Sequence, residues 1–286
     1  MTTGPIITPR FLVDDLSDNV EQYPTHTVVA EEEPAGFEAH RFSAGRRDQY
    51  SRASTANSDW WHKTTYDRPR TSDMVCLWVH NLPGKSYQLQ YSDDDYTTIQ
   101  AAVNCTIPTT PGAGSPADAN GVLCENGMWL KTFPARTAYA HRHFILAGGA
   151  GYIPYINGKV GLSLGLAQFD KPYMPSDTEL QVTEETNEAG WSGSSPRRPK
   201  RFGSILVKTR GIWEYEQFRY HFETRFGAGC PMVIVFDEAQ AERAVMAKRD
   251  GGRFGFQGVG GWPDAYRVGE FAWKELDPRE IGAPIP

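Results

Sequence analysis

The stretch from residue 60 to residue 99 constrains the fold most, because its side chains follow the two-residue period of β-strands. Residues 74–79 form a short apolar run rich in β-forming residues. Residues 86–91 alternate, so that one face of this strand carries Tyr87, Leu89 and Tyr91. The Asn-Leu-Pro-Gly segment at residues 81–84 and the acidic segment at residues 92–95 have the composition of tight turns. The stretch therefore predicts an antiparallel meander with one buried face.

The order of these segments resembles a known family. An aromatic pair precedes an apolar strand ending in His-Asn-Leu, then come a Tyr-Gln-Leu-Gln-Tyr-Ser strand and an acidic turn. This order resembles the galactose-binding-like jelly roll of discoidin and coagulation-factor C-type domains, in the variant found in tail proteins of bacteriophages and prophages. The resemblance covers residues 36–160, and its closing strand pattern matches Tyr139, Arg142, Phe144 and Leu146. It implies a mainly β fold built on a jelly-roll sandwich.

Size and charge limit the other possibilities. The chain has 286 residues, enough for two ordinary domains. Its formal net charge is −6, whereas a nucleic-acid-binding surface needs a dense set of cations. No apolar run reaches the length needed to span a bilayer, and the N-terminus lacks the apolar core of a signal peptide. We expect no nucleic-acid partner, no membrane span, and a product made in the cytoplasm of the host cell.

Residues 1–35 are predicted to form an extended N-terminal arm. They show little periodicity and end in an acidic run, yet they contain the apolar groups Ile6, Ile7, Phe11, Leu12 and Val13. Such an arm can lie along its own domain or along a neighbouring subunit, and it can add a strand where a sheet edge is free. We predict contacts with a neighbouring subunit in a homo-oligomer. The alternative is a disordered leader.

The four cysteines are unevenly spaced and contain no CxxC pair. Free, mostly buried thiols are expected at Cys76, Cys105, Cys124 and Cys230, with a disulfide or a zinc site as less favoured alternatives. The Gly-Ala-Gly segment at residues 112–114 is followed by Pro116 and lacks the third glycine of a dinucleotide loop. We therefore expect no cofactor.

Three groups of residues suggest binding chemistry, and each also has a structural explanation. Trp60 and Trp61 could stack on a sugar ring, although adjacent strand residues point to opposite faces, so at least one belongs to the core. His141 and His143 share one face at a spacing that metals use, but two exposed or partly packed histidines are the preferred interpretation. The acidic triplet at residues 93–95 could hold calcium, yet hairpin chemistry already explains it.

One motif suggests an enzyme. Residues 161–165 read Gly-Leu-Ser-Leu-Gly, which matches the nucleophile elbow of hydrolases around Ser163. An elbow needs a helix after the serine, and Pro172 and Pro175 follow too closely for one. We therefore interpret the segment as a connection between domains and predict no catalytic residue, no metal ligand and no enzymatic activity.

Residues 161–286 are predicted to form a smaller α+β domain. Residues 176–203 are interpreted as a polar loop between strands at 179–183 and 203–209. Residues 212–226 show the spacing of an amphipathic helix, and a buried strand follows at residues 231–236. This half is similar, more loosely, to the C-terminal part of the same tail proteins, whose closing pattern is echoed by Tyr266, Val268, Phe271 and Trp273. The glycine-dense residues 251–261 suit a mobile or interface loop.

Together these features predict a structural virion protein of a bacteriophage tail, near the tail tip or baseplate, that acts through contacts with other tail proteins and with its own copies. The alternative is a carbohydrate-binding module that attaches the particle to host glycans. A hydrolase has only the serine motif in its favour.

Overall fold

The structure is a computed structural model in which part of the chain is described. The described residues are 9–19, 22–43, 50–112, 114–146, 148–149, 151–165, 168–169, 177–179, 182–186, 192–196, 200–209, 216, 231–249, 255–258 and 267–276. They form two compact units. The described residues of unit 1 come from Met1–Gly165 and Met232–Val245, and those of unit 2 come from Leu166–Pro231 and Met246–Pro278.

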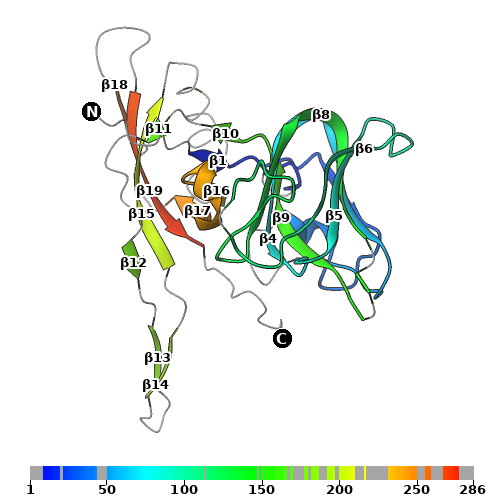
Figure 1. The fold of residues 1–286 in the computed structure, drawn as a ribbon, viewed down its shortest axis with the longest axis horizontal. Coiled ribbons are helices and arrows are strands. Elements are labelled where there is room, and N and C mark those ends of the chain that lie inside the picture. Colours follow the sequence, from blue (N-terminus) through cyan, green and yellow to red (C-terminus); the bar gives the residue numbers. More distant parts are fainter. Residues whose placement is uncertain are drawn as a thin grey trace. The chain divides into compact units, whose positions relative to one another are not determined.

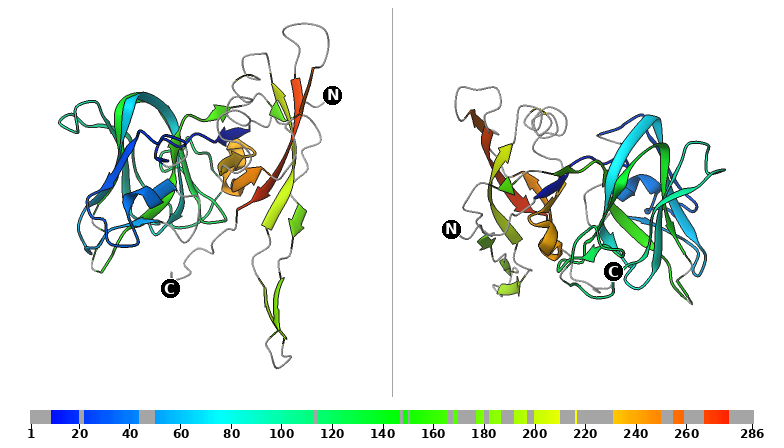
Figure 2. Two further views of the ribbon diagram at one scale, coloured as in Figure 1. Left: turned by 180° about the vertical axis from the view of Figure 1, so that it is seen from behind. Right: turned by 45° about the horizontal axis from the view of Figure 1, so that its top comes forward.

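Unit 1 contains an eight-stranded antiparallel sheet that folds over itself into a sandwich (Figures 1 and 2). Its main strand order is β3-β9-β4-β8-β5-β6, with β2 beside β4 and β7 beside β8. The strands are β2 (Thr27–Ala30), β3 (Ser51–Arg52), β4 (Trp60–His80), β5 (Ser86–Ser92), β6 (Gln100–Thr106), β7 (Val122–Leu123), β8 (Trp129–Ile145) and β9 (Tyr155–Gly161). A short 3-10 helix, η1 (Ala39–Ser43), lies between β2 and β3 in the chain. The predicted mainly β fold with a jelly-roll sandwich is confirmed.

Strands β4 and β8 are long enough to belong to both layers of the sandwich. Their pairing shifts register twice, between Thr65 and Arg70 and again between Ser72 and Met74. The first part of β4 pairs with β2 and its last part pairs with β9. The first part of β8 pairs with β7 and its last part pairs with β5. Each shift contains a proline, Pro69 in β4 and Pro134 in β8, which has no N–H to donate to the ladder.

The core lies between the two layers. Tyr87 of β5 meets Trp129 of β8 edge to face, with ring centroids 5.1 Å apart. The predicted inward face of residues 86–91 is confirmed, because Tyr87, Leu89 and Tyr91 are at most 2% exposed. Cys76, Cys105 and Cys124 are buried thiols, as expected, whereas Cys230 lies outside the described residues.

The N-terminal segment belongs to unit 1. Strand β1 (Arg10–Leu12) pairs with β16 (Met232–Val235) and with β10 (Leu164–Gly165). Phe11, Leu12 and Val13 are at most 3% exposed, so the prediction that these side chains reach a neighbouring subunit is wrong. Their burial in this chain already removes them from water. Ile6 and Ile7 lie outside the described residues.

The chain returns to unit 1 at Met232–Val245, between the two segments of unit 2. All four side chains of β16 are buried, as the sequence predicts for residues 231–236. The following 3-10 helix, η3 (Glu238–Arg243), is capped by the Asp237 carboxylate, which accepts a hydrogen bond from the Ala239 N–H at 3.0 Å. Asn126 donates to the Ala244 carbonyl at 3.0 Å and fastens this helix to the loop after β7. The predicted domain limits of 36–160 and 161–286 stay a prediction.

Unit 2 is built around one strand, β19 (Arg267–Glu275), which pairs with three others. Its remaining strands are β11 (Gln168–Phe169), β12 (Asp177–Glu179), β13 (Val182–Thr186), β14 (Ser192–Pro196), β15 (Lys200–Thr209), β17 (Val245–Arg249) and β18 (Gly255–Gly258). The hairpin β13-β14 lies within residues 176–203, where a loop was predicted, and β18 lies within the glycine-dense segment. The helix predicted at residues 212–226 lies outside the described residues, apart from Glu216. No helix in the described part of the chain is long and apolar enough to cross a bilayer.

The burial of β1 predicts a large effect of truncating Phe11. Phe11→Ala should lower the free energy of unfolding by about 3–5 kcal/mol, because it opens a cavity between β1 and its neighbours. Urea unfolding followed by tryptophan fluorescence measures this change. Ile99→Ala is the control, because Ile99 is 47% exposed, and it should cost less than about 0.5 kcal/mol. Equal, small losses in both variants would show that β1 is not part of the core.

Candidate functional site

The two adjacent tryptophans point to opposite faces of the sheet. Trp60 is 1% exposed and packs in the core, whereas Trp61 is partly exposed on the outer face. Directly across the ladder from Trp61 lies Phe144 of β8, which is also partly exposed. The prediction that at least one of the tryptophans is a core residue is confirmed, and the other one stands beside a second aromatic ring.

Cationic side chains pack among the aromatic rings on this face. The Arg142 guanidinium lies 4.3 Å from the centroid of the Tyr96 ring and 5.4 Å from that of Phe144. The Lys63 ammonium lies 5.9 Å from the Trp61 ring and 5.9 Å from the Tyr96 ring. Such cation–π contacts hold flexible side chains in one arrangement. We call this surface the outer aromatic face, which comprises Trp61, Lys63, Gln88, Tyr96, Asn104, Arg142 and Phe144.

A chain of hydrogen bonds orders the polar groups of the outer aromatic face. Arg142 donates from Nε to Gln90 at 2.5 Å, and Gln90 donates to the Gln88 side chain at 2.5 Å. Gln88 in turn donates to the Asn104 side chain at 3.5 Å. Gln90 is 5% exposed, so it acts as a buried link, and the amides of Gln88 and Asn104 remain at the surface in a fixed orientation.

The acidic turn after β5 brings Tyr96 onto this face. Asp95 and Tyr96 have positive φ angles of 53° and 67°, which turns the chain back sharply. The Asp94 carboxylate accepts hydrogen bonds from Thr98 N–H and from the Ser92 hydroxyl, each at 2.9 Å, and these bonds lower its pKa. Asp93 accepts from the Tyr139 N–H at 3.0 Å, and Asp95 pairs with Lys63 at 2.9 Å. Each of the three aspartates therefore has a partner among the described residues: Asp94 within the turn, Asp93 on β8 and Asp95 on β4.

The histidine pair lies inside the sandwich. His141 and His143 are both 0% exposed, so the prediction of exposed or partly packed side chains is wrong. His141 shares hydrogen bonds with the hydroxyls of Tyr66 and Ser17, the latter at 3.1 Å, and His143 shares one with the Tyr87 hydroxyl at 2.6 Å. Burial holds the pKa of both rings well below the usual value. Within the described ranges no three His, Cys, Asp or Glu residues gather as a metal site.

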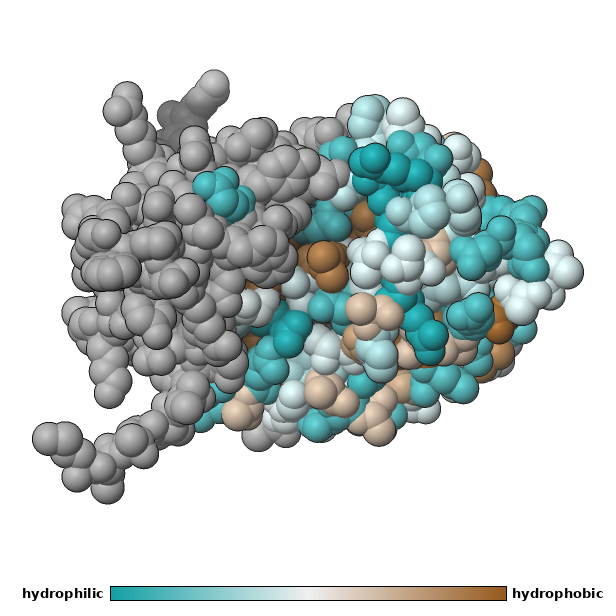
Figure 3. Space-filling model, turned by 90° about the horizontal axis from the view of Figure 1, so that it is seen from above, coloured by the Kyte–Doolittle hydropathy of each residue, from teal (hydrophilic) through white to brown (hydrophobic). Residues whose placement is uncertain are grey.

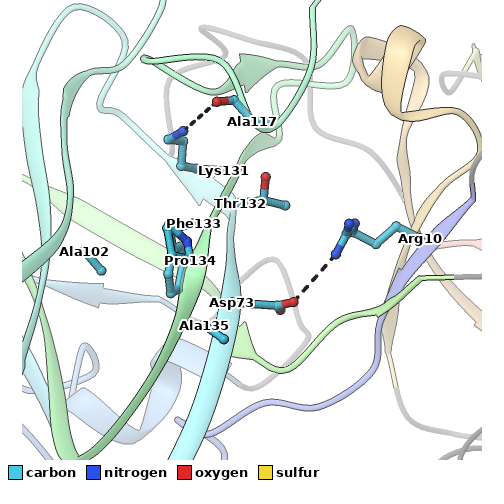
Figure 4. Close-up of a pocket in the computed structure, with 9 residues that line it drawn as sticks. All are labelled: Arg10, Asp73, Ala102, Ala117, Lys131, Thr132, Phe133, Pro134 and Ala135. Carbon is cyan, nitrogen blue, oxygen red and sulfur yellow. Dashed lines mark hydrogen bonds and ion pairs between the residues drawn. The ribbon is translucent and has the colours of Figure 1, made fainter.

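A pocket of about 410 Å³ lies at the second register shift of the β4–β8 ladder (Figure 4). At this shift Asp73 of β4 stands opposite three residues of β8, which are Phe133, Pro134 and Ala135. The ladder is interrupted there, and the backbone bends away. The lining residues are Arg10, Asp73, Ala102, Ala117, Lys131, Thr132, Phe133, Pro134 and Ala135.

Asp73 and Arg10 point toward one another across the pocket, 3.6 Å apart (Figure 4). Asp73 also accepts hydrogen bonds from the Ser163 N–H at 2.7 Å and from the Ser163 hydroxyl at 3.0 Å. Arg10 donates to the Ser163 hydroxyl at 2.6 Å and pairs with Glu238 at 2.6 Å. Burial is the main influence on Asp73 and raises the pKa of its carboxyl.

These contacts give Ser163 a structural role. Its hydroxyl donates to Asp73 at 3.0 Å and its oxygen accepts from Arg10 at 2.6 Å, so both partners hold the side chain in place. Its hydrogen bonds to described side chains involve only Asp73 and Arg10, and no histidine. Ser163 thus ties the segment before β10 to β1 and β4.

Sequence reasoning missed Arg10, Asp73, Lys131 and Tyr96. The sequence holds one signal: Pro134 has no N–H to donate to a strand ladder, and it lies where the ladder shifts and the pocket forms. The fold-back of Tyr96 depends on positive φ angles, which the sequence of the turn does not specify.

No protein-family model matches the sequence, and no sequence among curated proteins matches it. Among solved structures, the chain is similar to chitosan-binding module 1 of a chitosanase/glucanase from Paenibacillus sp. IK-5, with 24% identity, a TM-score of 0.38 and coverage of 51% of this chain and 98% of that one. It is also similar to CpGH89CBM32-5 from Clostridium perfringens, in complex with GalNAc-β-1,3-galactose, with 11% identity, a TM-score of 0.37 and coverage of 48% and 94%.

A third similar structure is a GH29 fucosidase from Ruminococcus gnavus in complex with fucose, with 13% identity and a TM-score of 0.40. Here the match covers 52% of this chain and 27% of the fucosidase, so the chain spans about a quarter of that protein. At these TM-scores and identities the similarities assign no ligand or activity to this chain.

The buried histidines predict a stability that depends on pH. Burial lowers the pKa of His62 to about 4 from an ordinary 6.5, so the unfolded chain takes up this proton first as the pH falls. The stability from His62 is full above pH 6.5 and is lost as the pH falls toward 4. Between about pH 7.5 and about pH 5.5 this loss amounts to about 1.4 kcal/mol.

Asp15 has the opposite effect on stability: burial raises its pKa to about 7, so its contribution is lost as the pH rises. The contribution of His62 is therefore isolated by comparing the parent with a variant at both pH values. Between about pH 7.5 and about pH 5.5 the His62→Phe variant should lose about 1.4 kcal/mol less unfolding free energy than the parent does. Identical pH dependence in the parent and the variant would show that His62 is not buried in the neutral form.

The hydrogen bonds of Ser163 predict a structural effect of its removal and no catalytic one. Ser163→Ala should lower the unfolding free energy by about 1–2 kcal/mol, because Asp73 and Arg10 each lose a partner. Reducing-sugar assays on a panel of polysaccharides should give the same result for the variant and the parent. Loss of a measurable hydrolytic activity at an unchanged melting temperature would restore the nucleophile interpretation.

Proposed function

We propose that unit 1 is a carbohydrate-binding module that holds a glycan chain on its outer aromatic face. The observation that carries this proposal is the placement of Trp61 beside Phe144 on the solvent side of the β4–β8 ladder. Flat aromatic rings offer apolar area to the C–H faces of sugar rings with little loss of side-chain entropy. Neighbouring aromatic rings that stay partly exposed are a feature of binding surfaces.

Hydrogen-bonding groups flank the two rings. Gln88 lies directly across from Phe144, and Asn104 lies directly across from Gln88, so one row crosses four strands. With strands about 4.8 Å apart, the row spans roughly 14 Å, the length of a short oligosaccharide. Its amides both donate and accept hydrogen bonds, which suits sugar hydroxyls.

The face is ordered by its own contacts. The hydrogen-bond chain from Arg142 through Gln90 fixes the Gln88 amide, and Tyr96 covers one side of the Arg142 guanidinium. A ligand therefore meets side chains that already occupy their binding positions, which lowers the entropic cost of association. The coloured part of the surface in Figure 3 is mostly hydrophilic and near-neutral, with hydrophobic residues among them.

Assembly into a bacteriophage tail, with other tail proteins and further copies as partners and the virion as the location, stays a prediction. It rests on the resemblance of the sequence segments. Such a location is compatible with glycan binding, because a tail-tip protein that holds host glycans would attach the particle to its host.

Truncation of Trp61 should weaken glycan binding strongly. Affinity electrophoresis of the full chain in gels that contain neutral glucans, galactans or chitin derivatives identifies the polysaccharide that retards it most. For that polysaccharide, Trp61→Ala and Phe144→Ala should each lower the affinity by about 10- to 30-fold, because each removes one of the two rings on which a sugar would stack.

Tyr139→Ala is the matched control, because Tyr139 is an aromatic residue of the same strand β8 and is 47% exposed, but lies outside the row. It should bind as the parent does. Equal losses in all three variants, or no retardation of the parent by any polysaccharide, would contradict the proposal.

A further inference from the structure

We infer that the pocket at the second β4–β8 register shift is a separate binding site for a small hydroxycarboxylate of the size of one sugar acid, such as a hexuronate. The pocket shares no residue with the outer aromatic face. The inference therefore does not depend on the proposed function and extends it to a different ligand.

Lys131 supplies one free donor to the pocket. Its ammonium donates to the carbonyls of Ala117 at 3.2 Å and of Asp118 at 2.6 Å, as Figure 4 shows for Ala117. Since an ammonium has three N–H groups, one remains for a ligand. The two carbonyls fix its position, and no carboxylate of the described residues forms an ion pair with it.

Arg10 and Asp73 pair with each other at 3.6 Å and are also held by partners outside the lining of the pocket. Arg10 uses Nε for Glu238 and Nη1 for Ser163, so among the described residues its Nη2 group has no acceptor. Asp73 is fixed by the Ser163 amide and hydroxyl, which leaves carboxylate lone pairs directed at the pocket. The hydrogen-bonding groups that a ligand can use are thus cationic donors at Arg10 and Lys131 and an acceptor at Asp73.

The complementary ligand carries a carboxylate for the cationic donors and a hydroxyl for Asp73. Charge-assisted hydrogen bonds from arginine and lysine to a carboxylate are stronger than neutral ones. Thr132 adds a hydroxyl to the lining, while Pro134 and Ala135 offer apolar surface to a C–H face. A volume of about 410 Å³ is at the lower end of the range for ligand sites and accommodates one monosaccharide.

Isothermal titration calorimetry of the full chain tests this inference, with galacturonate and glucuronate as probes and galactose and glucose as their neutral counterparts. We expect at least one uronate to bind and its neutral counterpart to bind at least 10-fold more weakly. Lys131→Gln should lower the uronate affinity at least 10-fold. Lys85→Gln should leave it unchanged, because Lys85 contacts the Gly148 carbonyl and the Tyr152 ring, away from the pocket.

Thr132→Val is a second variant for the case that Lys131→Gln alters the fold. It keeps the shape of the side chain, removes the hydroxyl, and should also weaken uronate binding. Absence of binding by both uronates to the parent would overturn the inference, as would equal affinity for the acid and the neutral sugar. Unchanged uronate affinity in folded Lys131→Gln and Thr132→Val variants would overturn it as well. None of these outcomes bears on the polysaccharide binding assigned to Trp61.

Discussion

The pairing of β4 with β8 decides which side chains of these two strands face outward and which face the core of unit 1. Trp61 lies across from Phe144 and His62 lies across from His143, so this single register sends the aromatic pair outward and the histidine pair inward. A slip of one residue would reverse both faces and would expose the histidines while burying Trp61. The core therefore selects the register, and the register creates the outer aromatic face.

The polar core explains why the N-terminal segment packs against its own sandwich. Buried polar groups need hydrogen-bond partners, and residues 14–17 supply several. Ser17 reaches His141, Asp15 pairs with the buried Lys159 of β9 at 3.4 Å, and Asp14 accepts from the Tyr23 hydroxyl at 2.5 Å. Without this segment, an ammonium and an imidazole inside unit 1 would lose partners, which is costly in a medium of low polarity. The same segment delivers Arg10 to the pocket.

The sequence predicted individual strands better than it predicted where side chains lie in the fold. The alternation of residues 86–91 and the apolar run at residues 231–236 were sufficient to predict strands β5 and β16, because strand periodicity is a local property. The same period predicted that at least one of Trp60 and Trp61 lies in the core, but it did not show which one. The histidine pair was misassigned because polarity alone favours exposure, and the tyrosine and serine hydroxyls that satisfy it come from β4, β5 and the N-terminal segment.

The pocket could not be derived from the sequence because its charged groups come from β1, β4 and β8 and meet only through tertiary pairing. Proline at position 134 marked the interruption of a strand, but the residue opposite it depends on the register of β4. Likewise, the apolar pattern of residues 11–13 showed that they leave water, whereas the partner that covers them, β16, lies more than two hundred residues along the chain.

The central claim is that glycans contact the outer aromatic face, and the indole N–H signals of the chain's eight tryptophans test it most directly. In a two-dimensional NMR titration with an oligosaccharide of the polysaccharide that binds, assigned by tryptophan variants, the account predicts a saturable shift of the Trp61 indole signal. The signal of Trp60, which belongs to the next residue but lies in the core, should stay in place. A shift of other indole signals with no movement at Trp61 would contradict the account and place the glycan elsewhere.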